Sequence, residues 1–214
     1  MTPHVVAHRS GNSVSGLHAA EPITKTIEVD LHLGADGNLE ARHSKRIWLT
    51  NRFWERWYLL PPGHHGVQFG SVVAAAHPST EFWLDVKGAN PKLPERVFTE
   101  LPIDRVRFVS TKSWWLLRRF LDVPGVQTFR SAGNRLELLV LLVRLLFPTG
   151  IDGAVVHSRL LSRRVAGRLT RHGLLYTWAA NDVGAIVQLA GRGVDGFSVD
   201  DLGVVAELEF TGRP

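Results

Sequence analysis

The chain has 214 residues, of which 44% are hydrophobic and 21% charged, and its formal net charge at pH 7 is +5. This composition is typical of a globular protein with a core of ordinary size and excludes extensive disorder. The sequence contains no cysteine, which excludes disulfides and thiolate metal sites, so a metal would need oxygen or imidazole ligands. The first residues have neither the basic region nor the apolar segment of a signal peptide, and we expect a cytoplasmic protein.

The positive charge does not by itself indicate a nucleic-acid partner. The arginines are dispersed along the chain rather than interleaved with aromatic residues on one strand face, and no recognition motif occurs. We therefore expect no nucleic acid. A basic surface suits an anionic lipid or a phosphorylated substrate equally well, so peripheral contact with an anionic membrane is an open alternative. The sequence leaves the oligomeric state unknown.

The N-terminal elements are predicted from apolar alternation and turn residues. Strands are expected over residues 5–8 and 26–31, separated by a polar loop over 11–16 and a short segment over 17–21. A Gly-Ala-Asp-Gly-Asn turn then returns the chain as a short hairpin that ends over 39–43.

The rest of the chain alternates helices with strands, after one irregular segment. Residues 47–62 are aromatic and basic and follow no clean period, so we expect a capping loop or short helix over a pocket mouth. Helices are then predicted over 67–76, 92–100, 113–120, 135–147, 159–172 and 182–191 and after Asp200, and strands over 81–87, 105–110, 126–129, 153–157, 174–179 and 194–199. Eight strands in this alternation predict an α/β fold, a single-domain (β/α)₈ TIM barrel over residues 1–214.

The helix over residues 136–147 is strongly apolar. It has about a dozen residues, which is too short to span a bilayer, and Arg144 interrupts it. We expect a helix buried against the barrel. A lipid-facing or dimer-forming helix is the alternative.

Three carboxylates indicate a metal site. Successive side chains of a strand point to opposite faces, so Glu28 and Asp30 share one face of their strand. Asp85 lies at a similar depth on a neighbouring predicted strand. In a (β/α)₈ barrel the active site lies at the carboxyl ends of the strands, where these three groups would offer oxygens to one hard cation.

Histidines and basic residues accompany these carboxylates. His8 and His43 are candidates for a general acid and base because imidazole titrates near neutrality. Arg9 offers a forked donor to a phosphate group, and Lys87 shares the face of Asp85. Each residue alone also has an ordinary explanation, such as a structural histidine or a surface ion pair. Their clustering at one end of the predicted barrel favours a functional site.

The order of these motifs resembles the glycerophosphodiester phosphodiesterase family. The resemblance rests on His8-Arg9, Glu28-Val29-Asp30, Asp36-Gly37, His43, Leu84-Asp85-Val86-Lys87, the run from Tyr176 to Asp182 with Trp178 and Asn181, and the run from Gly193 to Asp200. The match spans residues 5–200 in the order of the family.

The resemblance implies a reaction and a role for each matched residue. It implies a divalent metal ion, Ca or Mg, on Glu28, Asp30 and Asp85, an acid/base pair of His8 and His43, and phosphate or substrate contacts from Arg9, Lys87, Trp178 and Asn181. The family reaction cleaves a glycerophosphodiester into sn-glycerol 3-phosphate and an alcohol, and relatives act on lysophospholipids.

The sequence departs from the family pattern at several positions. Ser10 replaces a glycine, Asp85 a commoner glutamate and Ser44 an aspartate, the Pro-Glu-Asn segment is missing, and the usual insertion is reduced to the aromatic run over 48–58. Two alternatives therefore stay open. One is a lysophospholipase D type lipid phosphodiesterase, whose acyl chain the apolar helix and the aromatic run could seat. The other is a catalytically degenerate barrel that binds a phospholipid or phosphate.

Overall fold

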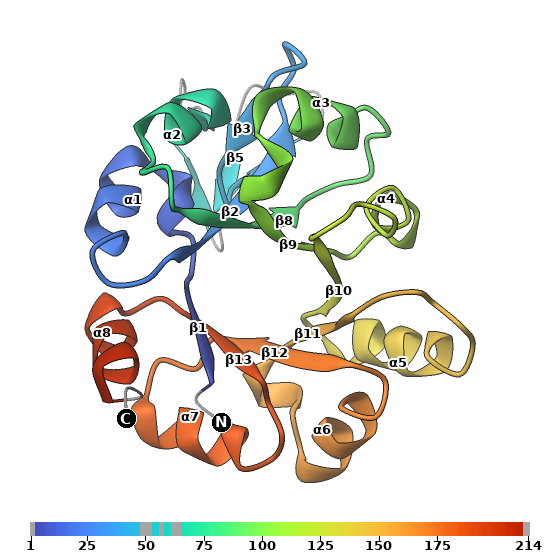
Figure 1. The fold of residues 1–214 in the computed structure, drawn as a ribbon. Helices are drawn as coiled ribbons and strands as arrows, with labels where there is room; N and C mark the ends of the chain where they lie inside the picture. Colours follow the sequence, from blue (N-terminus) through green and yellow to red (C-terminus); the bar gives the residue numbers. More distant parts are fainter. Residues whose placement is uncertain (1–2, 48–52, 56–57, 61–65, 212–214) are drawn as a thin grey trace.

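The computed structural model describes residues 3–47, 53–55, 58–60 and 66–211. Eight parallel strands form a closed barrel in chain order (Figure 1): β1 (His4–Ala7), β2 (Thr26–Leu33), β8 (Glu81–Val86), β9 (Val106–Thr111), β10 (Gln127–Ala132), β11 (Gly153–His157), β12 (Leu174–Trp178) and β13 (Gly196–Val199). Strand β1 pairs with both β13 and β2, and these pairings close the barrel. The predicted single-domain (β/α)₈ architecture is confirmed.

Helices surround the barrel (Figure 1). They are α1 (Val14–Ala20), α2 (Phe69–Ala75), α3 (Leu93–Glu100), α4 (Trp114–Leu117), α5 (Arg135–Arg144), α6 (Arg163–Leu169), α7 (Val183–Ala190) and α8 (Leu202–Thr211), with 3₁₀ turns over Ser10–Asn12, Ile103–Arg105 and Ser158–Leu160. Five of them begin at a side chain that accepts a backbone N–H, namely Ser13, Ser113, Asn134, Ser162 and Asp182. Each cap of this kind stabilises its helix by about 1 kcal/mol.

Strand β2 shows how the sequence alternation positions the site. Ile27, Val29 and Leu31 are fully buried in the apolar layer between the strands and the helices. The intervening side chains therefore point into the barrel. A second layer inside the barrel, which is rich in aromatic rings, fills the space below them: Val6, Trp83, Phe108, Phe129, Val155 and Tyr176. The polar groups of β2 thus lie above a packed apolar floor.

Three predicted elements near the strand ends differ from the structure. The expected polar loop over 11–16 is wrong in its second half, because Ser13 accepts a hydrogen bond from Gly16 N at 3.0 Å and starts helix α1. Residues Val67–Gln68 form strand β7, which pairs with β3 (Leu39–Ala41) before the helix begins. The helix expected over 159–172 is shorter, because a 3₁₀ turn precedes α6.

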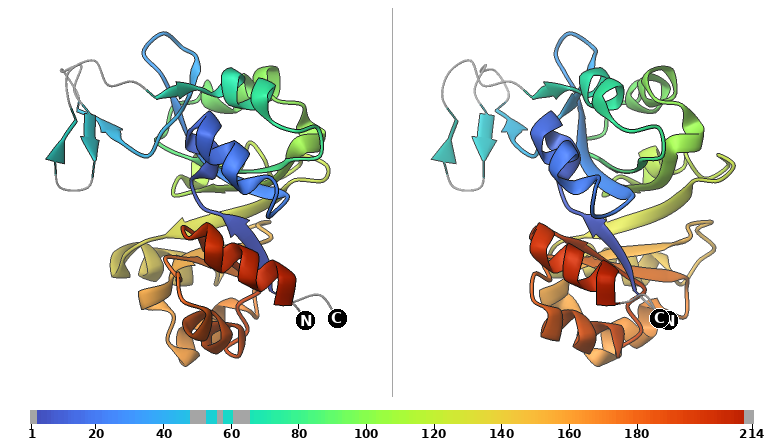
Figure 2. Two further views of the ribbon diagram at one scale, coloured as in Figure 1. Left: turned by 90° about the vertical axis from the view of Figure 1, so that its left-hand side faces the viewer. Right: turned by 60° about the vertical axis from the view of Figure 1, so that its left-hand side comes forward.

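The expected capping loop or short helix over 47–62 is wrong for the residues that the structure describes. Strands β4 (Lys45–Arg46), β5 (Phe53–Glu55) and β6 (Tyr58–Leu59) form a separate antiparallel sheet that projects from the barrel (Figure 2). Trp48 and Trp57 lie outside the described residues. A three-stranded sheet of two or three residues per strand offers too few positions for a period to be read from the sequence.

Helix α5 is buried on one side only, so the expectation of a buried helix is wrong for its outer face. Leu138 and Leu141 are buried, whereas several apolar side chains on the opposite side of the helix are exposed. Among the described helices, none has the length and the apolar character needed to cross a membrane.

Candidate active site

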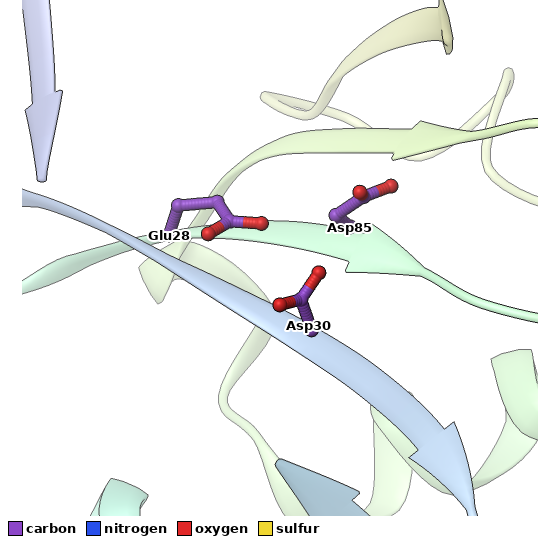
Figure 3. A group of neighbouring side chains, drawn as sticks. All are labelled: Glu28, Asp30 and Asp85. Carbon is purple, nitrogen blue, oxygen red and sulfur yellow. The ribbon is translucent and has the colours of Figure 1, made fainter. Parts of the chain in front are cut away.

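Pairing of β2 with β8 brings the three predicted carboxylates together. Asp30 and Asp85 are directly opposite each other in the register, and Glu28 lies two residues before Asp30 on the same face. One oxygen from each carboxylate lies within 4.8 Å of the others, and Figure 3 shows the three groups pointing toward one another. Glu28 and Asp30 are buried, and Asp85 is partly buried.

These carboxylates belong to a cavity of about 610 Å³ at the carboxyl ends of the strands. Eight of the nine predicted site residues line it: His8, Arg9, Glu28, Asp30, His43, Asp85, Lys87 and Trp178. Among the other lining residues are His32, Arg42, Trp83, Ser110, Thr111, Lys112, Ser131 and Ser198. The ninth predicted residue, Asn181, does not line the cavity.

Lys87 is the cation nearest to the carboxylates. Its Nζ lies 2.7 Å from Asp30 Oδ1 and is also hydrogen-bonded to Asp85 Oδ2. Burial alone would lower the pKa of Lys87, but the charges of Asp85, Asp30 and Glu28 raise it far above its usual range. The same contact, with a hydrogen bond from Asn12, holds the pKa of Asp30 below its ordinary value despite its burial.

The surroundings of Glu28 disfavour its ionised form. Burial, and then the negative charge of Asp30, raise the pKa of Glu28 from 4.5 to about 8. When Glu28 is ionised, the three carboxylates and two neighbouring cations, Lys87 and Arg9, leave a net charge of −1 in a buried space. A divalent cation with a preference for oxygen ligands would neutralise this charge, so Glu28, Asp30 and Asp85 fit a metal such as calcium or magnesium.

Both predicted catalytic histidines are held by a carboxylate. His8 Nδ1–H donates to Asp200 Oδ1 at 2.6 Å, and His43 Nδ1–H donates to Glu55 Oε1 at 2.6 Å. The pairing at Nδ1 leaves Nε2 as the nitrogen that can exchange a proton in the cavity, and His8 Nε2 lies 4.0 Å from Glu28. Burial lowers the pKa of His8, but the charge of Glu28 and the hydrogen bond to Asp200 outweigh it and raise the pKa.

The segment after β1 orients the two carboxylates of β2. Arg9 N–H donates to Glu28 Oε2 at 2.6 Å, and the Arg9 backbone has φ 56°, a left-handed conformation that is strained for a residue with a side chain. Asn12 Nδ2 donates to Asp30 Oδ2, and Asn12 Oδ1 accepts from Asp30 N, both at 2.8 Å. Gly11 lies between them, where an added Cβ would be 2.8 Å from Val29 Cβ.

A second group of hydrogen bonds supports the other two acidic residues. Ser110 Oγ donates to Asp85 Oδ1 at 3.1 Å and accepts from Trp83 Nε1 at 2.9 Å. Asn181 Nδ2 donates to Asp200 Oδ2, and Asn181 Oδ1 accepts from Asp200 N, both at 2.9 Å. Asn181 therefore contacts the partner of His8 rather than the cavity itself.

Four residues of the site were not singled out from the sequence. Asn12 is hydrogen-bonded to Asp30, one of the predicted metal ligands, and Glu55 is hydrogen-bonded to His43. Neither Asn12 nor Glu55 belongs to a periodic pattern in the sequence. His32 continues the alternation of Glu28 and Asp30 along β2, and this signal could have found it; burial lowers its pKa to about 3. Arg42 is buried, donates to Glu40 Oε2 at 2.7 Å and lies over the ring of Phe53.

The fold and this site define a (β/α)₈ barrel with an acidic cluster, two carboxylate-held histidines and basic residues in one cavity. No protein-family model and no curated protein matches the sequence.

Solved structures of glycerophosphodiester phosphodiesterases match over nearly the whole chain. A phosphodiesterase from Oleispira antarctica in complex with the product sn-glycerol-3-phosphate is 14% identical, with a TM-score of 0.72 over 98% of this chain and 97% of that chain. The glycerophosphodiester phosphodiesterase of Thermotoga maritima is 14% identical, with a TM-score of 0.69 over 97% and 99% of the two chains. One from Parabacteroides distasonis is 18% identical, with a TM-score of 0.69 over 99% and 98%. This chain has the fold of those proteins.

Proposed function

We propose that the protein is a metal-dependent phosphodiesterase that hydrolyses glycerophosphodiesters to sn-glycerol 3-phosphate and an alcohol. The observation that carries the proposal is the convergence of the acidic cluster, Lys87 and two carboxylate-held histidines in one cavity. The shared fold supports it, as does the product bound to the Oleispira antarctica enzyme. Membership of the glycerophosphodiester phosphodiesterase family and a cytoplasmic location belong to the same proposal.

The residues of the cavity have separate roles in the reaction. Glu28, Asp30 and Asp85 would hold the divalent cation, which when bound polarises the phosphate and neutralises its charge. Arg9 and Lys87 lie beside this cluster and hold the phosphate oxygens by charge-assisted hydrogen bonds.

The two histidines move the protons. One of His8 and His43 removes a proton from the attacking oxygen as it forms a new P–O bond, and the other protonates the oxygen of the departing alcohol as its P–O bond breaks. Where the attacking oxygen is a hydroxyl of the substrate, water then opens the resulting cyclic phosphate to give sn-glycerol 3-phosphate. Asp200 and Glu55 orient the two imidazoles, since each accepts the Nδ1–H of its histidine. Trp178 forms a wall of the cavity for the alcohol, and Asn181 acts through Asp200.

A lysophospholipase D type activity is the second candidate function. The exposed apolar side chains of helix α5 favour it, because they could contact the acyl chain of such a substrate. The first turn of this helix lies next to the cavity, since Glu137 accepts a hydrogen bond from the lining residue Lys112. The degenerate-barrel alternative gains no support from the cavity, where all the predicted metal and acid/base residues are present.

Hydrolysis of glycerophosphocholine and lysophosphatidylcholine with Mg²⁺ or Ca²⁺ tests both candidates. We expect turnover of the water-soluble diester without detergent, and loss of turnover after treatment with EDTA. Activity only on the acylated substrate would favour the second candidate. A folded protein that hydrolyses neither substrate with either metal would contradict the proposed function.

Asp200→Asn tests the positioning of His8. The substitution keeps the shape but removes the negative charge that helps to raise the pKa of His8. We expect kcat to fall by about 10²-fold, the lower end of what a positioned general acid or base contributes, and the limb of the pH–rate profile that reports His8 to move to lower pH. The matched control is Asp201→Asn, because Asp201 instead accepts a hydrogen bond from Gly203 N in the first turn of α8. An unchanged pH–rate profile in Asp200→Asn would show that Asp200 does not position His8.

A further inference from the structure

Helix α5 carries an apolar surface on the outside of the barrel. Six side chains, called here the outer stripe, are between 45% and 70% exposed: Leu136, Leu139, Val140 and Val143 on α5, and Leu146 and Phe147 in the turn that follows it. They are six of the twelve large hydrophobic side chains that are exposed among the described residues. The four on α5 are spaced along one face of the helix, while Leu138 and Leu141 are buried on the other face. A helix with apolar residues on two faces is normally covered on both, so we expect the outer stripe to contact another apolar surface.

The neighbouring helix α4 also carries an exposed tryptophan. Trp115 of α4 is half exposed, and tryptophan is enriched where proteins meet the polar–apolar boundary of a membrane. The adjacent Trp114 lies under the guanidinium groups of Arg144 and Arg130, at 5.6 and 5.2 Å from their Cζ atoms. Because Arg144 belongs to α5, its contact with Trp114 links α5 to α4.

Positive charge flanks the outer stripe. Residues 135–181 contain seven arginines and two carboxylates, Glu137 and Asp152, and Glu137 accepts hydrogen bonds from Lys112 Nζ and Gly133 N. The carboxylate of Asp152 accepts hydrogen bonds from Thr128 N and Oγ1 at 2.7 and 3.1 Å. Helix α6 follows α5 around the outside of the barrel (Figure 1). The exposed arginines of α6 are Arg163, Arg164 and Arg168, and the exposed Arg171 follows the end of this helix.

We propose that the outer stripe of α5 and the arginines of α6 form a docking surface for an anionic lipid bilayer. Apolar side chains would enter the acyl boundary while the arginines contact anionic headgroups. A second copy of the chain fits less well, because a symmetric contact would bring two sets of arginines together while Glu137 and Asp152 are already hydrogen-bonded within each chain. Contact is peripheral, since α5 has only ten residues. The inference does not rest on the proposed hydrolysis of glycerophosphodiesters.

Co-sedimentation of the full chain with vesicles tests this surface. We expect wild type to bind vesicles of phosphatidylcholine with phosphatidylglycerol at least about tenfold more tightly than vesicles of phosphatidylcholine alone. The double variant Leu139→Glu, Val143→Glu should lose about tenfold or more of this binding, because two charges would have to enter the acyl boundary. Both positions are exposed, so circular dichroism should show an intact fold. Arg163→Gln with Arg164→Gln should reduce the preference for anionic vesicles.

The matched control is Val187→Glu. Val187 of α7 is 63% exposed, similar to Leu139 at 58%, and lies two helices further round the barrel from α5. We expect it to bind vesicles as wild type does. Equal binding of wild type to neutral and anionic vesicles, or unchanged binding of the double variant, would overturn the proposal. So would a wild-type dimer that the double variant dissociates, if wild type binds no vesicles.

Discussion

His8→Gln is expected to lower kcat for glycerophosphodiester hydrolysis by about 10²- to 10⁴-fold, the range attributed to a positioned general acid or base. His8 lines the cavity, its Nδ1–H is held by Asp200, and its Nε2 is directed toward Glu28. Glutamine keeps a polar side chain at the strand end but cannot carry a proton between solvent and substrate. Steady-state kinetics of the folded variant, with metal at saturation, measures the loss.

His157→Gln is the matched control for this variant. His157 lies at the carboxyl end of β11, at the same end of the barrel, but is not one of the residues that line the cavity. We expect its kcat to stay within a few-fold of wild type. Equal losses in His8→Gln and His157→Gln would indicate a general disturbance of the strand ends and would remove His8 from the acid/base pair.

The sequence was sufficient for the barrel and for the acidic cluster because both depend on simple periods. The alternation of β2 places Ile27 and Val29 against the helices and Glu28 and Asp30 in the barrel, whatever the neighbouring strand is. Parallel pairing in chain order then brings Asp85 to the register position of Asp30. The predicted metal ligands thus follow from strand geometry together with strand order.

The remaining parts of the site depend on contacts between distant segments that have no period. Glu55 reaches His43 from a small sheet outside the barrel, and its neighbours in sequence follow no pattern. Asn12 belongs to a 3₁₀ turn that the sequence suggests only as a polar loop. For α5 the error has another cause, because apolar residues on both faces of a helix predict burial, and only the structure shows that one face lacks a cover.

Glu28 gives the second large effect, on stability rather than on turnover. Its pKa is about 8 in the folded protein and 4.5 as the reference value, so the folded state keeps a proton that the unfolded state has released. The free energy of unfolding of the metal-free protein should therefore fall as pH rises from about 4.5 to about 8 and change little above that. A shift of this size corresponds to roughly 3–5 kcal/mol. His8, whose pKa is also raised, contributes in the same direction.

Glu28→Gln is expected to remove most of this decline and to abolish turnover. Glutamine resembles the protonated carboxyl in shape and cannot be ionised, so the metal-free variant should be more stable than wild type at pH 9 and similar to it at pH 5. Urea unfolding in EDTA at the two pH values measures the difference.

Added Ca²⁺ or Mg²⁺ should raise the Tm of wild type but not that of the variant, because binding to the native state stabilises it. Glu95→Gln, at an exposed carboxylate on α3, is the control and should keep the decline. A Glu28→Gln variant with the same pH dependence as wild type would mean that Glu28 is ionised in the metal-free fold without cost, and the case for a cation that balances a destabilised carboxylate would fail.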